Sequence, residues 1–268
     1  MHAPKIMENI EAIRRESPLI HNISNYVANN ITANVLLALG ASPVMAHAID
    51  EVEEMCSNSK ALVINIGTLD YKWVVSMQRA GAIARAKKIP IILDPVGAGA
   101  TKYRTYTALS LLNEVTPSII RGNASEILAL AGRPIKSKGV ESRHKPEEAI
   151  EAAHELSAKY GLVVSISGST DIVIKNNKMC SIANGHPTMS KIVGFGCISA
   201  AVVGACAAVS KSYFDATIHA MAIMGITGEK AGKKTSLPGF FQMHFINALH
   251  TLKLSDFTNN IKIHETRL

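Results

Sequence analysis

Aromatic side chains are scarce in this sequence: they make up 5% of its 268 residues and include a single tryptophan. Charged residues reach only 18%, whereas apolar residues reach 47%, and this balance excludes an intrinsically disordered chain. With so few rings, the core is built from Ala, Val, Ile, Leu and Met, which favours helices packed on a sheet of aliphatic strands. The length suits one large α/β domain, and we expect residues 1–268 to form a single domain.

Zinc-binding patterns are also missing. The four cysteines form no Cys-x-x-Cys pair, and the ten histidines show no His-x-x-x-His or His-Glu-x-x-His spacing. The first sixteen residues carry charges throughout and leave no room for the apolar region of a signal peptide. Free thiols and the lack of such a signal predict a cytoplasmic protein.

One apolar run needs an explanation, because the nineteen uncharged residues 192–210 approach the length of a membrane span. The run contains three glycines, two serines and two cysteines, so its total hydrophobicity is weak. We therefore expect a helix buried inside the domain and no membrane partner. Ala200, Gly204 and Ala208 have a spacing that permits close packing, either within the chain or between subunits.

The net charge of +7 is compatible with an anionic partner but does not identify one. Basic residues are scattered, with only short pairs such as Lys87-Lys88, whereas nucleic-acid binders usually cluster them and interleave aromatic residues. A small phosphorylated ligand fits the charge equally well. We expect no nucleic-acid partner.

Helical and strand patterns alternate along most of the chain. Residues 61–66 and 91–93 are continuous apolar runs, typical of strands buried on both faces. Residues 171–175 and 178–182, joined by Asn176-Asn177, predict an antiparallel hairpin. The alternation implies right-handed crossovers and an α/β fold with a mainly parallel sheet covered by helices on both faces.

In such sheets ligands bind beyond the carboxyl ends of the strands. Asp94 ends one buried strand and opens a glycine-rich loop, so it is placed where a metal or phosphate site would be. Arg121, Asn123 and Glu126 lie at the next strand end; Arg121 could hold a phosphate and Glu126 a divalent ion, or the group could simply cap a helix. Ser167 follows a third strand.

Gly194 and Gly196 open the apolar helix just before Cys197. Two glycines allow a tight turn and a close backbone approach, and the first free N–H groups of a helix attract an anion. The segment is neither a P-loop nor a dinucleotide fingerprint. Cys197 lies in the first helical turn, where the dipole is expected to lower the pKa of its thiol and make it a candidate base; packing is the alternative.

Taken together, these segments resemble the hydroxyethylthiazole kinase family of the ribokinase-like superfamily. The matching stretches are PLIHNISNYVANNITAN (18–34), GASPVMAHAIDEVEE (40–54), INIGTLD (64–70), LDPVGAGATKYR (93–104), IIRGNASEILALAG (119–132) and NGHPTMSKIVGFGC (184–197). They run in order over most of the chain, and DPVGAGAT and RGNASEI are highly specific.

The resemblance implies a ribokinase-like three-layer sandwich and transfer of the γ-phosphate of ATP, with Mg²⁺, to the primary alcohol of 4-methyl-5-(2-hydroxyethyl)thiazole in thiamine synthesis. It implies a homotrimer with active sites between subunits. The positions it matches to functional ones are Met45, Gly194 and Asn25 for the thiazole; Arg121, Ser167, Asn123 and Gly196 for ATP; Asp94 and Glu126 near magnesium; and Cys197 at the position of the base.

The sequence departs from the family pattern at the helix start, where Val193 and Phe195 replace a hydroxyl residue and a small residue. Three other interpretations therefore stand beside the thiazole kinase. They are a related kinase of hydroxymethylpyrimidine or a sugar, a thiazole- or nucleotide-binding protein without turnover, and a nucleic-acid-binding protein suggested only by the charge.

Overall fold

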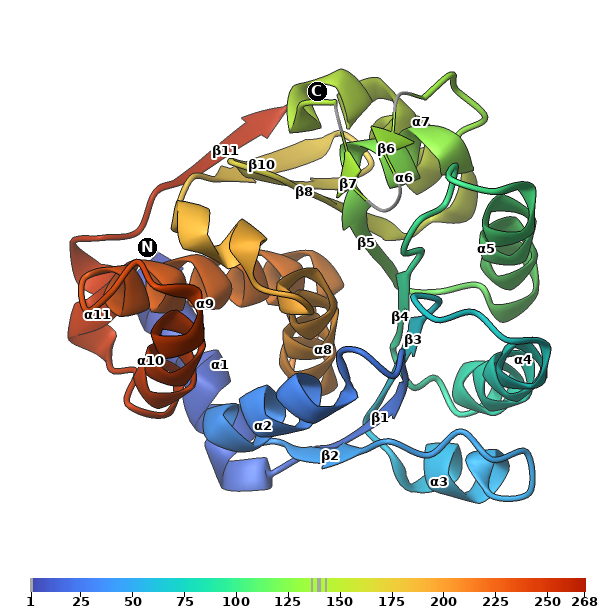
Figure 1. Ribbon diagram of the computed structural model, residues 1–268, viewed down its shortest axis with the longest axis horizontal. Coiled ribbons are helices and arrows are strands. Elements are labelled where there is room, and N and C mark those ends of the chain that lie inside the picture. The colour runs from blue at the N-terminus through green and yellow to red at the C-terminus, as the bar shows by residue number, and fades with distance from the viewer. Residues whose placement is uncertain (1, 136, 139–140, 143) are drawn as a thin grey trace.

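The computed structural model describes residues 2–135, 137–138, 141–142 and 144–268 and is built on a central sheet of nine strands (Figure 1). Along the sheet the order is β11-β10-β9-β8-β5-β4-β3-β1-β2. The strands are β1 (Leu19–Ile23), β2 (Ser42–Val44), β3 (Ala61–Asn65), β4 (Ile91–Asp94), β5 (Ile119–Asn123), β8 (Val163–Ser167), β9 (Asp171–Lys175), β10 (Lys178–Ile182) and β11 (Ile263–Arg267). A separate small pair is formed by β6 (Ser137–Lys138) and β7 (Glu141–Ser142).

Six adjacent strands, from β2 to β8, are parallel, and the three strands beyond β8 are antiparallel. The carboxyl ends of the six parallel strands therefore lie along one edge of the sheet. The predicted hairpin is confirmed as β9 and β10, with Lys178 paired to Lys175. Strand β11 has no counterpart in the sequence prediction; it is held by pairing with β10 rather than by a local apolar pattern.

Helices cover both faces of the sheet, as Figure 1 shows, and confirm the predicted α/β class. One face packs against helices that come from the two ends of the chain, the other against helices from its middle. The first set is α1 (His2–Glu16), α2 (Asn29–Leu39), α8 (Phe195–Ala208), α9 (Tyr213–Gly232), α10 (Pro238–His250) and α11 (Leu254–Thr258). The second set is α3 (Val52–Asn58), α4 (Tyr71–Ala86), α5 (Lys102–Val115), α6 (Ala124–Leu130) and α7 (Ile150–Tyr160). Short 3-10 turns are Pro146–Ala149 and Pro187–Lys191.

The central strands are apolar throughout because successive side chains enter the two separate cores. In β3, Leu62 and Ile64 pack against the middle helices, whereas Val63 between them packs against the terminal ones. Strand β4 repeats the pattern: Ile92 packs against the terminal helices, whereas Ile91 and Leu93 pack against the middle ones. Both faces of these strands are thus buried, as their continuous apolar runs predict.

The apolar run 192–210 contains helix α8, which lies directly on β1, β3 and β4. A Cβ added at Gly204 would lie 2.8 Å from Val63 Cγ2, so the small residues serve close packing within the chain. Among the described residues, no helix is both long and apolar enough to cross a bilayer. The run is a core helix, as expected.

Candidate functional site

Polar residues end the parallel strands in register along one edge of the sheet. Asn65 of β3 pairs with Asp94 of β4, and Asn123 of β5 pairs with Ser167 of β8. In β3 and β4 the polar residue is the last one of an otherwise aliphatic strand. The structure therefore brings together the side chains that the sequence analysis placed at separate strand ends.

A chain of hydrogen bonds connects the ends of β1, β3 and β4 with helix α8. Asn25 Nδ2 donates to Cys197 Sγ (3.2 Å) and to Asn65 Oδ1 (2.8 Å). Asn65 Nδ2 in turn donates to Asp94 Oδ2 (2.6 Å). Asn25, Asn65 and Asp94 are almost fully buried, whereas Cys197 is half-buried. The two ends of this chain of hydrogen bonds are the Cys197 thiol and the Asp94 carboxyl, and both groups are able to act on a ligand.

The Asp94 carboxyl is held in an unusual electrostatic state. Only 1% of its surface is exposed, and burial raises its pKa to about 7 against the opposing effect of the Arg121 guanidinium. Its second oxygen, Oδ1, is buried and has no hydrogen-bond partner within the described part of the chain. A buried carboxyl oxygen without a hydrogen-bond partner can accept a bound cation or a proton.

Glu126 ties two loops together. Its Oε1 accepts from the N–H of Gly97 (2.8 Å) after β4, and its Oε2 accepts from the N–H of Asn123 (2.7 Å), the last residue of β5. Asn123 Oδ1 accepts from the N–H of Glu126 (3.0 Å), which completes a capping box at the start of α6. Burial raises the pKa of Glu126. Helix capping, one of the two interpretations of this segment, is therefore present.

Arg121 stands between this polar edge and a cavity of about 560 Å³ lined also by Ser167, His186, Phe195 and Gly196. The Arg121 side chain is 9% exposed, and its buried Nε has no hydrogen-bond partner among the described residues. A buried guanidinium with an unused donor, at the wall of a cavity, is a site for an anionic group. The cavity therefore fits a phosphorylated ligand.

The start of α8 approaches Arg121 closely. Gly194 caps the helix with a φ of +86°, a conformation that favours glycine. At Gly196 an added Cβ would lie 3.2 Å from Arg121 Nη1. The guanidinium thus lies against the first turn of α8, and a guanidinium and the free N–H groups at a helix start both attract negative charge.

Gly196→Ala is expected to lower kcat/KM for the kinase reaction that the sequence resemblance implies about tenfold, because the new methyl group displaces the Arg121 guanidinium by a few tenths of an ångström. The melting temperature stays the same or rises, since alanine favours the helix over glycine. Gly239→Ala is the matched control: Gly239 is the second residue of α10, and an added Cβ there meets no atom within 4 Å. Steady-state kinetics and thermal unfolding of both variants check this; equal activity of the two would contradict it.

The sequence expectation that the pKa of Cys197 is lowered is wrong. Burial and the neighbouring Asp94 raise the pKa of its thiol to about 11, against weaker effects of Asn25, Asn65 and Arg121. The helix dipole does not overcome the cost of burying a thiolate. Near neutral pH the group is therefore a protonated thiol that accepts a hydrogen bond from Asn25.

The two departures at the helix start lie apart from the polar chain. Val193 is 70% exposed, and the Phe195 ring is buried against Phe241 and Phe245 with centroids 6.1 and 4.8 Å away. Phe195 thus belongs to an aromatic cluster at the cavity wall. Its bulk is accommodated by packing in the core.

Two predicted site residues, Met45 and Ser167, lie outside the hydrogen bonds that connect Asn25, Asn65 and Asp94. Met45 directly follows the edge strand β2 and is half-buried, at the end of the row of strand ends. Ser167 Oγ donates to the carbonyl of Gly122 (3.3 Å) and lines the cavity. Both are at the predicted edge of the sheet.

Sequence reasoning missed Asn65 and Arg104. Asn65 lies inside the run 61–66 that predicts a buried strand, and it is identified only by its register with Asp94. Arg104 of α5 donates to the carbonyls of Ile66 (2.7 Å), Val96 (2.8 Å) and Gly67 (2.6 Å), which joins the loops after β3 and β4. Its only sequence signal is its place at the end of the LDPVGAGATKYR segment.

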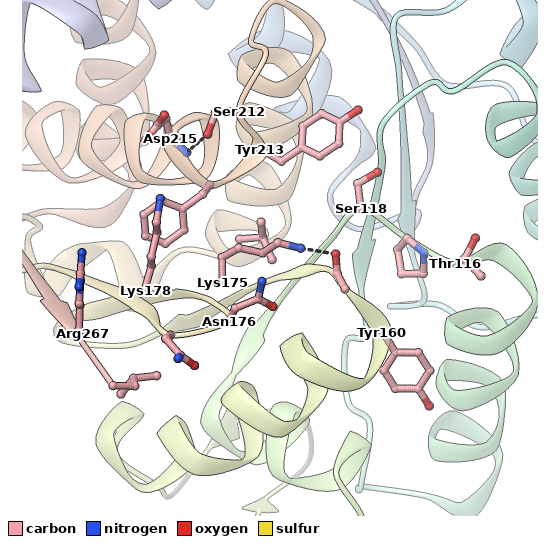
Figure 2. Close-up of a pocket in the computed structure, with 16 residues that line it drawn as sticks. Thr116, Ser118, Tyr160, Lys175, Asn176, Lys178, Ser212, Tyr213, Asp215 and Arg267 are labelled. Carbon is pink, nitrogen blue, oxygen red and sulfur yellow. Dashed lines mark hydrogen bonds between the residues drawn. The ribbon is translucent and has the colours of Figure 1, made fainter.

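A larger cavity of about 890 Å³ lies at the opposite end of the strands (Figure 2). Ser118, which precedes β5, and Val163, which begins β8, line it together with Lys175 and Lys178. Lys175 Nζ donates to the carbonyl of Gly161. No residue selected from the sequence lines this cavity, so size alone does not locate the candidate site.

The residues present fit a magnesium ion that takes one carboxylate from the protein and most of its other ligands from phosphates and water. No group of three His, Cys, Asp or Glu side chains gathers within the described residues. Asp94 Oδ1 lacks a partner and is one available ligand, whereas both oxygens of Glu126 already accept loop N–H groups. Magnesium commonly binds through one or two carboxylates, with phosphates and water as the other ligands.

Comparison with known proteins gives a consistent result. The profile of the hydroxyethylthiazole kinase family matches residues 10–255. A hydroxyethylthiazole kinase of Syntrophus aciditrophicus is 51% identical over 255 residues, 95% of this chain and 94% of that protein. The solved structure of a hydroxyethylthiazole kinase from Pyrococcus horikoshii OT3 superposes with a TM-score of 0.90 at 38% identity, covering 98% of this chain and 99% of that one.

A ribokinase-like superfamily protein from Enterococcus faecalis shares the fold, with a TM-score of 0.62 at 13% identity over 86% of each chain. The predicted ribokinase-like architecture is thereby confirmed. The match of the family profile spans most of the sheet and all of the strand ends described above. The chain therefore belongs to the hydroxyethylthiazole kinase family.

Proposed function

We propose that this chain transfers the γ-phosphoryl group of ATP to the primary alcohol of 4-methyl-5-(2-hydroxyethyl)thiazole, forming the monophosphate used in thiamine synthesis. The membership of the family supports the activity. The observation that carries the site assignment is the buried Arg121 guanidinium, with an unpaired Nε, between the 560 Å³ cavity and the polar chain that ends at Asp94. In this arrangement ATP occupies the cavity and the alcohol approaches from the Asn25–Cys197 side.

Phosphoryl transfer passes through a loose transition state, so positioning and charge stabilisation supply most of the catalysis. Arg121 and the first N–H groups of α8 at Gly194 and Gly196 would stabilise the charge on the transferred group. Ser167 and Asn123 would contact the nucleotide at the ends of β8 and β5. Met45 and Asn25 would contact the thiazole.

ATP is the co-substrate that a kinase of this family requires. Magnesium would be held by Asp94 through its unpaired oxygen. Glu126 would lie nearby, because it accepts a hydrogen bond from Gly97 in the loop that follows Asp94. When bound, the ion would neutralise charge on the phosphates. Asp94 and Arg121 would then hold opposite sides of the phosphate-binding space.

The same proposal includes a cytoplasmic homotrimer in which neighbouring subunits complete each active site, and a single domain over residues 1–268. A single nine-stranded sheet that uses strands from both ends of the chain supports one domain. Exposed apolar side chains support association, among them Tyr26 (65% exposed), Val27 (62%) and Leu37 (60%) at and near α2. Sedimentation equilibrium measures the subunit number.

A coupled ADP-release assay with purified protein and Mg-ATP tests the activity, with hydroxyethylthiazole, hydroxymethylpyrimidine and ribose compared as acceptors. We expect ADP release to depend on the thiazole. Turnover only with hydroxymethylpyrimidine or ribose would identify a related kinase. A thiazole-induced rise in melting temperature without turnover on any acceptor would instead identify a binding protein.

Cys197→Ser is expected to retain kcat to within about threefold, because a thiol with a pKa of about 11 is almost fully protonated at neutral pH and cannot be the required base. A serine hydroxyl can still accept the hydrogen bond from Asn25. The measurement is kcat at saturating ATP and thiazole at pH 7.5. A loss of more than a hundredfold would show that the sulfur takes part directly.

A further inference from the structure

Asn65 occupies the middle of the polar chain and has an amide orientation that the backbone determines. Its Oδ1 accepts from the N–H of Gly67 (2.9 Å) as well as from Asn25 Nδ2 (2.8 Å). These two donors saturate the oxygen, so the amide nitrogen must face Asp94. At 2.6 Å from Asp94 Oδ2, this nitrogen can only donate.

The Asn25 amide is oriented in the same way. Its Oδ1 accepts from the N–H of Ala28 (2.9 Å), which directs Nδ2 toward both Asn65 Oδ1 and Cys197 Sγ. Two backbone N–H groups, of Gly67 and Ala28, therefore set the direction of the hydrogen bonds that link Cys197, Asn25, Asn65 and Asp94. Neither amide can flip alone without leaving a buried polar atom unpaired, which costs about 1–3 kcal/mol.

The Gly67 N–H is itself held in place. Arg104 donates to the carbonyls of Ile66 and Gly67 in the same turn and to the carbonyl of Val96 after β4. The turn that carries Asn65 is thus joined to the loop that follows Asp94. Asn65 is 1% exposed and does not line the 560 Å³ cavity, so it reaches that site only through its neighbours.

We infer that Asn65 is a positioning residue for the proposed phosphoryl transfer. Its buried amide holds Asp94 on one side and Asn25, with Cys197, on the other. The Asp94 carboxyl near the phosphates and the Asn25 and Cys197 side chains near the alcohol therefore keep one relative geometry. The inference rests on the proposed function. It explains why a polar residue ends a strand whose other four residues are apolar and buried. It makes Asn65 act through Asp94 and Asn25 rather than by contact with substrate.

Asn65→Ala and Asn65→Asp test this assignment. Alanine removes all three hydrogen bonds of the amide, and aspartate keeps the shape but replaces the donor to Asp94 with an oxygen. We expect kcat to fall about a hundredfold in both, with KM for ATP changed by less than about threefold. Asn9→Asp is the matched control, a similarly buried amide (8% exposed) on α1, which should lower the melting temperature while leaving kcat unchanged.

A double-mutant cycle separates positioning from general loss of stability. Because part of the effect of Asn65 passes through Asn25, the loss of kcat in Asn25→Ala combined with Asn65→Ala should be smaller than the product of the losses in the two single variants. Multiplicative losses in kcat would overturn the inference, as would Asn65 variants with wild-type kcat. If the wild-type protein itself fails to phosphorylate hydroxyethylthiazole, the proposed function fails instead, and the two outcomes are distinguished in the same assay.

Discussion

Arg121→Ala lowers kcat/KM for ATP about 10³-fold, the largest effect that we expect from a single substitution in this protein. The guanidinium is buried beside the cavity, has an unused Nε donor, and lies within reach of the N–H groups that begin α8. Removing it takes the main positive charge from the space that receives the phosphates. Arg121→Lys retains the charge but loses the planar fork, so its loss is smaller, about 10²-fold.

The control for this prediction is Arg133→Ala, which removes an exposed arginine paired with Glu155 (2.6 Å). An exposed pair of this kind contributes little to stability, so activity and melting temperature should stay near those of the wild type. Steady-state kinetics with varied ATP at saturating thiazole provide the measurement. Wild-type turnover by Arg121→Ala would remove Arg121 from the phosphate site.

The position of Asp94 could be predicted from the sequence because it ends an apolar run identified as a buried strand, and that of Arg121 because it directly follows the apolar pair Ile119 and Ile120 of β5. The edge shared by parallel strands then brings such ends together without knowledge of the strand order. The hairpin of β9 and β10 was predicted for a similar reason, since its pattern and its Asn176-Asn177 turn are local. These features depend on a few neighbouring residues.

Asn65, Arg104 and β11 depend instead on contacts between distant segments. Asn65 looks like the end of an aliphatic strand until its register with Asp94 is known, and Arg104 looks like an ordinary helix residue until three loop carbonyls surround it. The pKa of Cys197 was misjudged because the helix dipole can be inferred from sequence but the degree of burial cannot. Tertiary contacts decide the roles of Asn65 and Arg104, the formation of β11 and the pKa of Cys197.

Asp94→Asn should have opposite effects on activity and stability. The substitution replaces a buried carboxyl oxygen, which has no hydrogen-bond partner among the described residues, with an amide nitrogen, so kcat/KM falls by at least about 10²-fold. In the ligand-free protein the wild-type carboxylate is poorly solvated, and its ionisation at pH 8 costs a few kcal/mol of folding free energy. The asparagine variant avoids this cost and should therefore melt at a higher temperature than the wild type at pH 8.

The pH dependence follows from the pKa of Asp94, which folding raises from 3.8 to about 7. Between these values the folded protein keeps a proton that the unfolded chain has lost, so the contribution of Asp94 to stability falls as pH rises. The difference in melting temperature, variant minus wild type, should therefore grow from pH 5 to pH 8 when measured without ligands. Asp50→Asn, which removes an exposed carboxylate, controls for the loss of one negative charge. A difference that does not change with pH would mean that Asp94 is already ionised at pH 5, and that ligand-free Asp94 is better solvated than its burial implies.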